Sequence, residues 1–346
     1  MSRKILIGSA ILTVISIIGL IIYVNTGVEL PSDTDQVVTV ILANDDLPEF
    51  FKGKTGFAKN GDVTIWYEVM GDLDPTRETI LLVRGSSAPA LKWNSNFYQP
   101  FIDSGYQVIR YDNRGVGESS WIADWSKDNS YSLEYMAEDG MAVLDAAGVE
   151  KAHLIGKSMG GMIAQRMAIS HDDRVLSLTS IMSSGYGQDE TLPSISIEFK
   201  SNAFKLILKY QLINPNEANS MKFAVGISQL MKGDCPYELD TKLIAQKALY
   251  SVRKWGRGNP KVVEQHAQAI INSGSRLEEL KNLSLPTLVI HGKSDPIVRF
   301  EHGQKCAALI PNADTLFIAG MGHDLPQIYM DQFHKAIFKN MNTVNR

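Results

Sequence analysis

The chain has 346 residues, of which 44% are hydrophobic and 21% charged, and its formal net charge is −4. This hydrophobic content supplies a sizeable core, and the modest charged content excludes a disordered chain. No segment is basic enough to predict nucleic-acid binding. Two cysteines, Cys235 and Cys306, are too few for a disulfide framework, and a single bridge between them stays open. Neither lies in a metal-ligating spacing, so we expect no metal and no cofactor.

The N-terminus predicts a membrane anchor. Ile5–Val24 is a run of 20 residues without a charge, long enough to cross a bilayer once, and Arg3 and Lys4 precede it. No small-residue cleavage site and no lipobox cysteine follows, which favours an uncleaved signal anchor over a cleaved signal peptide. Residues 1–4 are then expected in the cytoplasm and the rest of the chain on the extracytoplasmic side, periplasmic or extracellular in a bacterium.

Residues 25–54 are predicted as a tether, within which Val37–Leu42 is apolar enough to dock on some other surface. From Val63 onward, short apolar runs alternate with helical segments, which is typical of a mainly parallel sheet covered by helices on both faces. The expected strands are Val63–Val69, Thr79–Val83, Tyr106–Tyr111, Ala152–Ile155, Val175–Ile181, Thr287–Ile290 and Thr315–Ile318. The sequence therefore predicts an α/β fold, with its first part over residues 55–184.

The most informative motif is Gly156-Lys157-Ser158-Met159-Gly160. It follows the apolar run Ala152–Ile155 and precedes a helical segment, Met159–Ser170. A serine on such a sharp strand-to-helix turn is a candidate nucleophile, and Gly156 and Gly160 are required because strand and helix crowd together there. For the pentapeptide alone, an ordinary Gly-Ser turn is the alternative.

A nucleophilic serine also needs donors for the negative charge that develops on the substrate oxygen. We expect one donor from the backbone amide of Met159, the residue after the candidate nucleophile. The other is expected from the amide of Ser86, in the loop Arg84–Ser87 that follows a predicted strand. A plain Gly-Ser turn is again the alternative for this loop.

Between residues 185 and 284 the alternation stops and only helices are predicted, namely Ile197–Leu212, Glu217–Met231, Glu238–Trp255 and Pro260–Asn272. The last begins with Asn259-Pro260, an N-cap followed by proline at the first helical position, and closes at Gly274. This segment is expected to form an inserted helical cap, and residues 285–346 return to the sheet.

Two candidate partners of Ser158 follow the last two strands. Asp295 comes after the run Thr287–Ile290, on a loop stiffened by proline, and His323 comes after Thr315–Ile318 on a glycine-flanked loop. Ser158 would attack an acyl carbon, His323 would take its proton, and Asp295 would hold the imidazole tautomer.

Each partner has a rival. Asp324, next to the histidine, is an alternative third member. The segment that follows the strand Val175–Ile181 is a second place to look for one, but it offers no carboxylate, and this favours Asp295. His291, at a strand end, is the alternative base. His323 is preferred because its loop follows the last strand, where an imidazole can reach over the serine.

Four segments together carry a resemblance to a known family: Asp112–Ser119, Tyr131–Asp139, Ala152–Gln165 and Arg174–Leu178. With them the chain resembles α/β-hydrolases of the serine esterase type, most closely the branch typified by aclacinomycin methylesterase. The resemblance implies an α/β-hydrolase fold with an inserted cap. The chain order serine, aspartate, histidine is also the order of this superfamily. Two residues depart from the family pattern: Arg84 stands where many relatives carry histidine, and Lys157 stands where a neutral residue is commoner.

Three functions are compatible with the sequence. The first is a membrane-tethered carboxylic ester hydrolase, with a small or medium apolar ester as its substrate. The second uses the same three residues on lactones, carbon–carbon bonds, aminoacyl substrates or in perhydrolysis. The third is a hydrolase-like protein that binds a ligand without catalysis, against which the complete set of three groups counts.

Overall fold

The computed structural model describes residues 19, 23–44, 47–71, 76–256 and 258–344. The chain divides into two compact units. The sheet unit consists of Pro48–Ile195, Lys232–Tyr237 and Arg253–Arg346. The helical unit consists of Met1–Leu47, Ser196–Met231 and Glu238–Val252.

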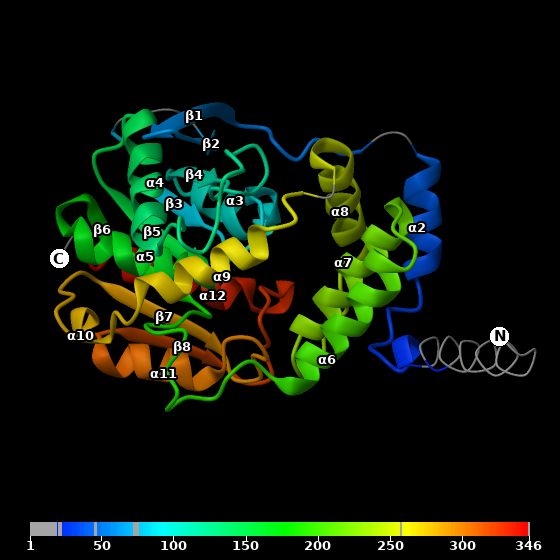
Figure 1. Ribbon diagram of the computed structural model, residues 1–346. Coiled ribbons are helices and arrows are strands. Elements are labelled where there is room, and N and C mark those ends of the chain that lie inside the picture. The colour runs from blue at the N-terminus through cyan, green and yellow to red at the C-terminus, as the bar shows by residue number, and fades with distance from the viewer. Residues whose placement is uncertain (1–18, 20–22, 45–46, 72–75, 257, 345–346) are drawn as a thin grey trace, which may run out of the picture. The chain divides into compact units, whose positions relative to one another are not determined.

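In the sheet unit the described strands form one eight-stranded sheet in the order β1-β2-β4-β3-β5-β6-β7-β8 (Figure 1). Their bounds are β1 Lys54–Asn60, β2 Val63–Met70, β3 Thr79–Val83, β4 Gln107–Tyr111, β5 Ala152–Lys157, β6 Val175–Ile181, β7 Thr287–Gly292 and β8 Asp314–Ile318. The pairs β1–β2 and β2–β4 are antiparallel, and every other neighbouring pair is parallel. The mainly parallel sheet predicted from the sequence is confirmed.

Helices cover both faces of this sheet. Because successive side chains of a strand point to opposite faces, Leu81 and Val83 of β3 lie in one core cluster while Ile80 and Leu82 lie in the other. The helices of the sheet unit are α3 Ser95–Asp103, α4 Leu133–Ala146, α5 Met159–Ser170, α9 Val262–Ser273, α10 Leu277–Leu280, α11 Phe300–Leu309 and α12 Met330–Met341. The first cluster contains residues of α4, α5, α9, α10 and α11, and the second contains residues of α3 and α12.

The helical unit contains α2 Thr34–Ala43, α6 Ile197–Leu206, the π-helical continuation η3 Ile207–Leu212, α7 Glu217–Met231, and α8 Thr241–Trp255 up to Val252. Its core joins Val38 and Ile41 of α2 to Met221 of α7 and Leu249 of α8. An ion pair between Lys222 and Asp35, with 2.6 Å between Nζ and Oδ1, adds to this packing.

The structure shows two elements near the start of the chain that were not predicted from the sequence. The predicted tether contains α2, whose apolar residues recur three and four positions apart and therefore share the face that packs on α7. The edge strand β1 was not predicted, because Lys54–Asn60 is largely polar and half exposed. Val37–Leu42 thus docks within the helical unit.

The helices predicted between residues 185 and 284 are present, with small changes at their ends. α9 begins at Val262 with Lys261 as N-cap, two residues later than the predicted Pro260, and it ends before Gly274 as expected. The division into units differs from the predicted cap of residues 185–284, since α9 and α10 group with the sheet.

The predicted membrane span, residues 5–24, lies almost entirely outside the described residues. Within the part of the chain that the structure does describe, none of the helices combines the length and the apolar composition needed to cross a membrane. The possible bridge between Cys235 and Cys306 is absent, and both thiols are free and buried.

Candidate active site

The turn between β5 and α5 holds Ser158 in a strained backbone conformation, with φ 59° and ψ −127°. Its amide donates to the carbonyl of Ile181 at the end of β6, at 2.8 Å. A Cβ on Gly156 would lie 2.2 Å from the carbonyl oxygen of Gly160, and one on Gly160 would lie 2.1 Å from that of Val83. Only glycine fits at both positions, because backbone atoms that cannot move aside fill the space.

Asp295 and His323 meet at the carboxyl ends of β7 and β8. The Nδ1 atom of His323 lies 2.6 Å from Oδ2 of Asp295. The other carboxylate oxygen, Oδ1, accepts the amides of Ile297 at 2.8 Å and Val298 at 2.9 Å. Both carboxylate oxygens are therefore fixed. With Nδ1–H donating to the carboxylate, Nε2 carries the lone pair that can accept a proton.

The structure separates Asp295 from its rival Asp324. The Oδ2 atom of Asp324 accepts the hydroxyl of Tyr237 at 2.7 Å, and its Oδ1 accepts the amide of Leu325 at 2.8 Å. The carboxylate that hydrogen-bonds the imidazole of His323 is that of Asp295.

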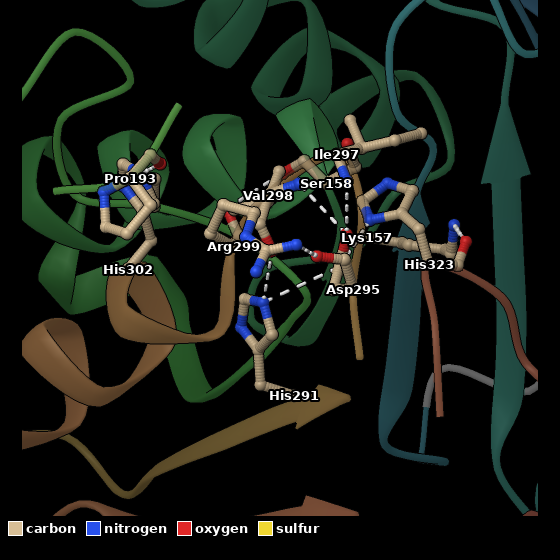
Figure 2. Close-up of polar contacts among 12 residues, drawn as sticks. Lys157, Ser158, Pro193, His291, Asp295, Ile297, Val298, Arg299, His302 and His323 are labelled. Atoms are coloured by element: carbon tan, nitrogen blue, oxygen red, sulfur yellow. Dashed lines mark hydrogen bonds and ion pairs between the residues drawn. The ribbon is translucent and has the colours of Figure 1, made fainter. Parts of the chain in front are cut away.

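His291, the rival base, also approaches Asp295, with its Nε2 atom 3.6 Å from Oδ2 (Figure 2). This Nε2 lies 2.8 Å from the carbonyl oxygen of Val298, to which it can only donate. His291 is completely buried, and burial lowers its pKa. A neutral His291 with its proton on Nε2 therefore fixes the Asp295 loop by donating to the carbonyl of Val298.

Burial and charge set the protonation of the central pair. Burial alone would raise the pKa of Asp295, but the charge of His323 and the hydrogen bond from it hold that pKa below the usual value. Burial lowers the pKa of His323, although Asp295 opposes the shift, and the charges of Lys157 and Arg84 lower it further. Near neutral pH the pair is therefore an ionised carboxylate and a neutral imidazole.

The loop after β3 passes directly over the candidate nucleophile. A Cβ on Gly85 would lie 3.0 Å from Cβ and 3.4 Å from Oγ of Ser158. Ser86, one of the two predicted oxyanion donors, is the next residue of this loop. Met159, the other, is the first residue of α5, a position whose amide no carbonyl of its own helix can reach.

Sequence reasoning missed His266, which holds this loop from α9. The amide of Ser87 donates to Nδ1 of His266 at 3.0 Å, and Nε2 of His266 lies 2.9 Å from the carbonyl oxygen of Arg114. An amide only donates and a carbonyl only accepts, so His266 is neutral with its proton on Nε2. Burial agrees with this state, since it lowers the pKa of His266 to about 4. Ser87 itself has a φ of 53°, an uncommon value for a residue with a Cβ.

Two cations stand close to the catalytic candidates. The Nζ atom of Lys157 donates to the carbonyl of His323 at 2.9 Å, and burial, followed by the charge of Arg84, lowers the pKa of Lys157 to about 7. The guanidinium of Arg84 lies 5.1 Å from the ring centroid of Trp93. Burial lowers the pKa of Arg84 to about 10, which leaves it charged at neutral pH. Lys157 thus fixes the backbone of the histidine loop.

Comparison with known proteins agrees with the fold described above. A family model described as the alpha/beta hydrolase fold matches residues 78–326. The chain belongs to the α/β-hydrolase family. It is 30% identical over 296 residues to a rhodomycin D methylesterase of Streptomyces peucetius, which covers 82% of this chain and 96% of that protein.

Two further matches have names that indicate other activities. A 2-hydroxy-6-oxononadienedioate/2-hydroxy-6-oxononatrienedioate hydrolase of a Pseudomonas species is 27% identical and covers 75% of this chain and 86% of that protein. Among solved structures, a membrane phospholipase A matches with a TM-score of 0.62 at 19% identity, covering 99% of each chain. At that identity the structural match shows the fold alone. The protein is thus a hydrolase of this fold, with rhodomycin D methylesterases and 2-hydroxy-6-oxononadienedioate hydrolases among its relatives.

Proposed function

We propose that the protein is a serine hydrolase that cleaves carboxylic esters through an acyl-enzyme. The observation that carries this proposal is the 2.6 Å contact between His323 and Asp295. The loop of His323 is joined to the strained turn of Ser158 by Lys157, the residue before the serine, whose Nζ donates to the carbonyl of His323 at 2.9 Å. Ser158 Oγ forms a bond to the acyl carbon while its proton passes to Nε2 of His323. The leaving alcohol takes that proton as the ester bond breaks, and water then repeats the sequence to release the acid.

The amides of Ser86 and Met159 would stabilise the oxyanion. Ser86 follows Gly85, whose backbone lies against Ser158, and Met159 is the residue after Ser158. Backbone donors held in place before the reaction lower its barrier without reorganising.

Ester hydrolysis is the first candidate because the rhodomycin D methylesterases of two Streptomyces strains are 30% and 29% identical to this chain. Carbon–carbon bond hydrolysis is the second candidate, since hydrolases of 2-hydroxy-6-oxononadienedioate match at 27 to 29% identity over comparable lengths. The same three residues serve both reactions, and the substrate decides between them.

We also propose that residues 5–24 anchor the protein in a membrane, with the catalytic part on the extracytoplasmic side. The support is the uncharged length of this run and the position of Arg3 and Lys4 on its N-terminal side only.

Covalent labelling with a fluorophosphonate probe tests the chemistry. We expect the full chain to be labelled and Ser158→Ala not to be, while Ser180→Ala, a buried serine of β6 that hydrogen-bonds Gln165, keeps its label. Asp295→Asn should lower kcat by about two to four orders of magnitude through loss of the correct tautomer, whereas Asp324→Asn keeps most of the activity. A panel of esters, lactones and vinylogous diketones then identifies the bond that is cleaved. Labelling that survives Ser158→Ala would exclude the proposed nucleophile.

A further inference from the structure

The helical run formed by α6 and η3 is apolar on two sides. Leu206 and Tyr210 point into the helical unit and are buried, and α6 and η3 both pack on α7. The same run also exposes large apolar side chains: Ile197 is 83% exposed, Phe204 51% and Leu212 64%. A soluble helix normally shows water a polar face, so an outward face of this composition needs a cover.

The end of the N-terminal apolar run is fastened to this same pair of helices. Nζ of Lys209 donates to Oδ1 of Asn25 at 2.8 Å, and Nζ of Lys205 donates to the carbonyl of Thr26 at 3.3 Å. The ammonium group of Lys205 also lies 5.1 Å from the ring centroid of Tyr23. These contacts lie within the helical unit, on either side of Val24, where the uncharged run ends.

This arrangement has the chemistry of a membrane surface. Tyrosine is enriched at the level of the lipid headgroups, and lysines place their ammonium groups at the phosphates while their stems follow apolar surface. Phe204 precedes Lys205 and Ile207 follows it by two positions, so apolar and cationic side chains alternate around one helix. Helices that lie in a bilayer interface have this combination of bulky apolar and basic residues.

We propose that the outward face of α6 and η3 lies on the surface of the bilayer that residues 5–24 enter. Phe204 and Ile207 would reach the boundary of the acyl chains, and Lys205 and Lys209 would face the lipid phosphates. This inference rests on the proposed membrane anchor and goes beyond it, because an anchor alone sets no orientation for the helical unit.

Fluorescence quenching by spin-labelled lipids tests the contact. The full chain would carry a fluorophore at Phe204→Cys or Ile207→Cys and be placed in phosphatidylcholine–phosphatidylglycerol vesicles that contain a lipid with a doxyl group high on its acyl chain. Both native cysteines are buried and at most 2% exposed, so they compete little for the label. The matched control is Val263→Cys on α9 of the sheet unit, which is 62% exposed and apolar like the test positions.

We expect quenching at positions 204 and 207 to exceed that at 263 by about twofold or more. Flotation of each variant with the vesicles is measured in parallel. A protein that floats but shows equal quenching at all three positions overturns the inference and leaves the anchor intact. A protein that does not float overturns both. Positions 204 and 207 that are shielded from aqueous iodide without being quenched by the lipid would show that protein covers this face, which also overturns the inference.

Discussion

In the proposed mechanism the imidazole of His323 must be neutral to accept the proton of Ser158, so its pKa is expected to set the acid limit of activity. Burial is the main reason that the pKa of His323 lies below the usual value of 6.5. Asp295 opposes this shift, and the neighbouring cations Lys157 and Arg84 lower the pKa further. The neutral form therefore persists below pH 6.5. We expect kcat/KM for a neutral ester to fall on the acid side with a midpoint below this value.

The charge of Lys157 is one cause of the lowered pKa of His323, and replacing this residue tests its effect. Below about pH 7 its ammonium is charged and lowers the pKa of His323, so Lys157→Met should move the acid limb of the kcat/KM profile to higher pH. An acid limb that stays in place, with the variant still folded, would show that this charge does not reach the imidazole. The variant also leaves the carbonyl of His323 without its donor, which costs stability by about 1–3 kcal/mol.

His266 should act on the rate through the loop that contains Ser86. Replacement by leucine removes the acceptor for the amide of Ser87 and the donor to the carbonyl of Arg114. We expect His266→Leu to lower kcat by about ten- to a hundredfold with little change in KM, since donors aimed at the oxyanion act mainly in the transition state. Steady-state kinetics on a small soluble ester measure this split.

His302 provides the matched control for this variant. It is also a buried histidine between two partners, the hydroxyl of Ser184 at 2.9 Å and the carbonyl of Pro193 at 3.1 Å. His302→Leu should lower the free energy of unfolding and keep kcat. Equal losses of kcat in both variants would assign His266 a structural role only.

Residues that follow strand ends could be located from the sequence, whereas the contacts behind them could not. Ser158, Asp295 and His323 each follow an apolar run with a turn signal, and parallel strands bring such ends to one edge of the sheet. His266 lies in a helix and meets Ser87 across 179 positions of the chain. No local pattern marks that pairing, because it depends on how α9 packs.

At the scale of elements, the apolar pattern of α2 predicts that it docks but does not predict where. Its apolar residues were visible in the sequence, yet their partners, Met221 and Leu249, lie about two hundred positions away. The strand β1 was not predicted because its sequence does not alternate apolar and polar residues, and it forms by pairing with β2. Central strands, which are buried on both faces, were predicted closely.

The packing of α2 predicts a measurable cost when it is weakened. Ile41 is 5% exposed within the core of the helical unit, so Ile41→Ala should lower the free energy of unfolding of that unit by about 2–5 kcal/mol. Val40, the neighbouring residue, is 54% exposed, and Val40→Ala should leave stability nearly unchanged. Hydrogen exchange of α7 amides reports the difference. Similar exchange in both variants would mean that α2 contributes little to this core.

At the scale of the whole molecule, the arrangement of charges about residues 5–24 predicts the side on which the catalytic part lies. With Arg3 and Lys4 on the N-terminal side only, Met1 should face the cytoplasm. Protease added to spheroplasts should therefore digest the sheet unit, and a chain that begins at Asn25 should be released as a soluble, active hydrolase. Protection of the sheet unit from protease would reverse the proposed topology.

The attachment of α2 also determines how the molecule bears mechanical load. The chain passes through Thr26 and α2, both fastened within the helical unit, before it enters β1 at Lys54. A tension that arrives through the first residues is therefore resisted first by the contacts of Lys205, Lys209 and Ile41. While these hold, a pull on the first residues acts on the helical unit and is not passed along the chain directly into β1.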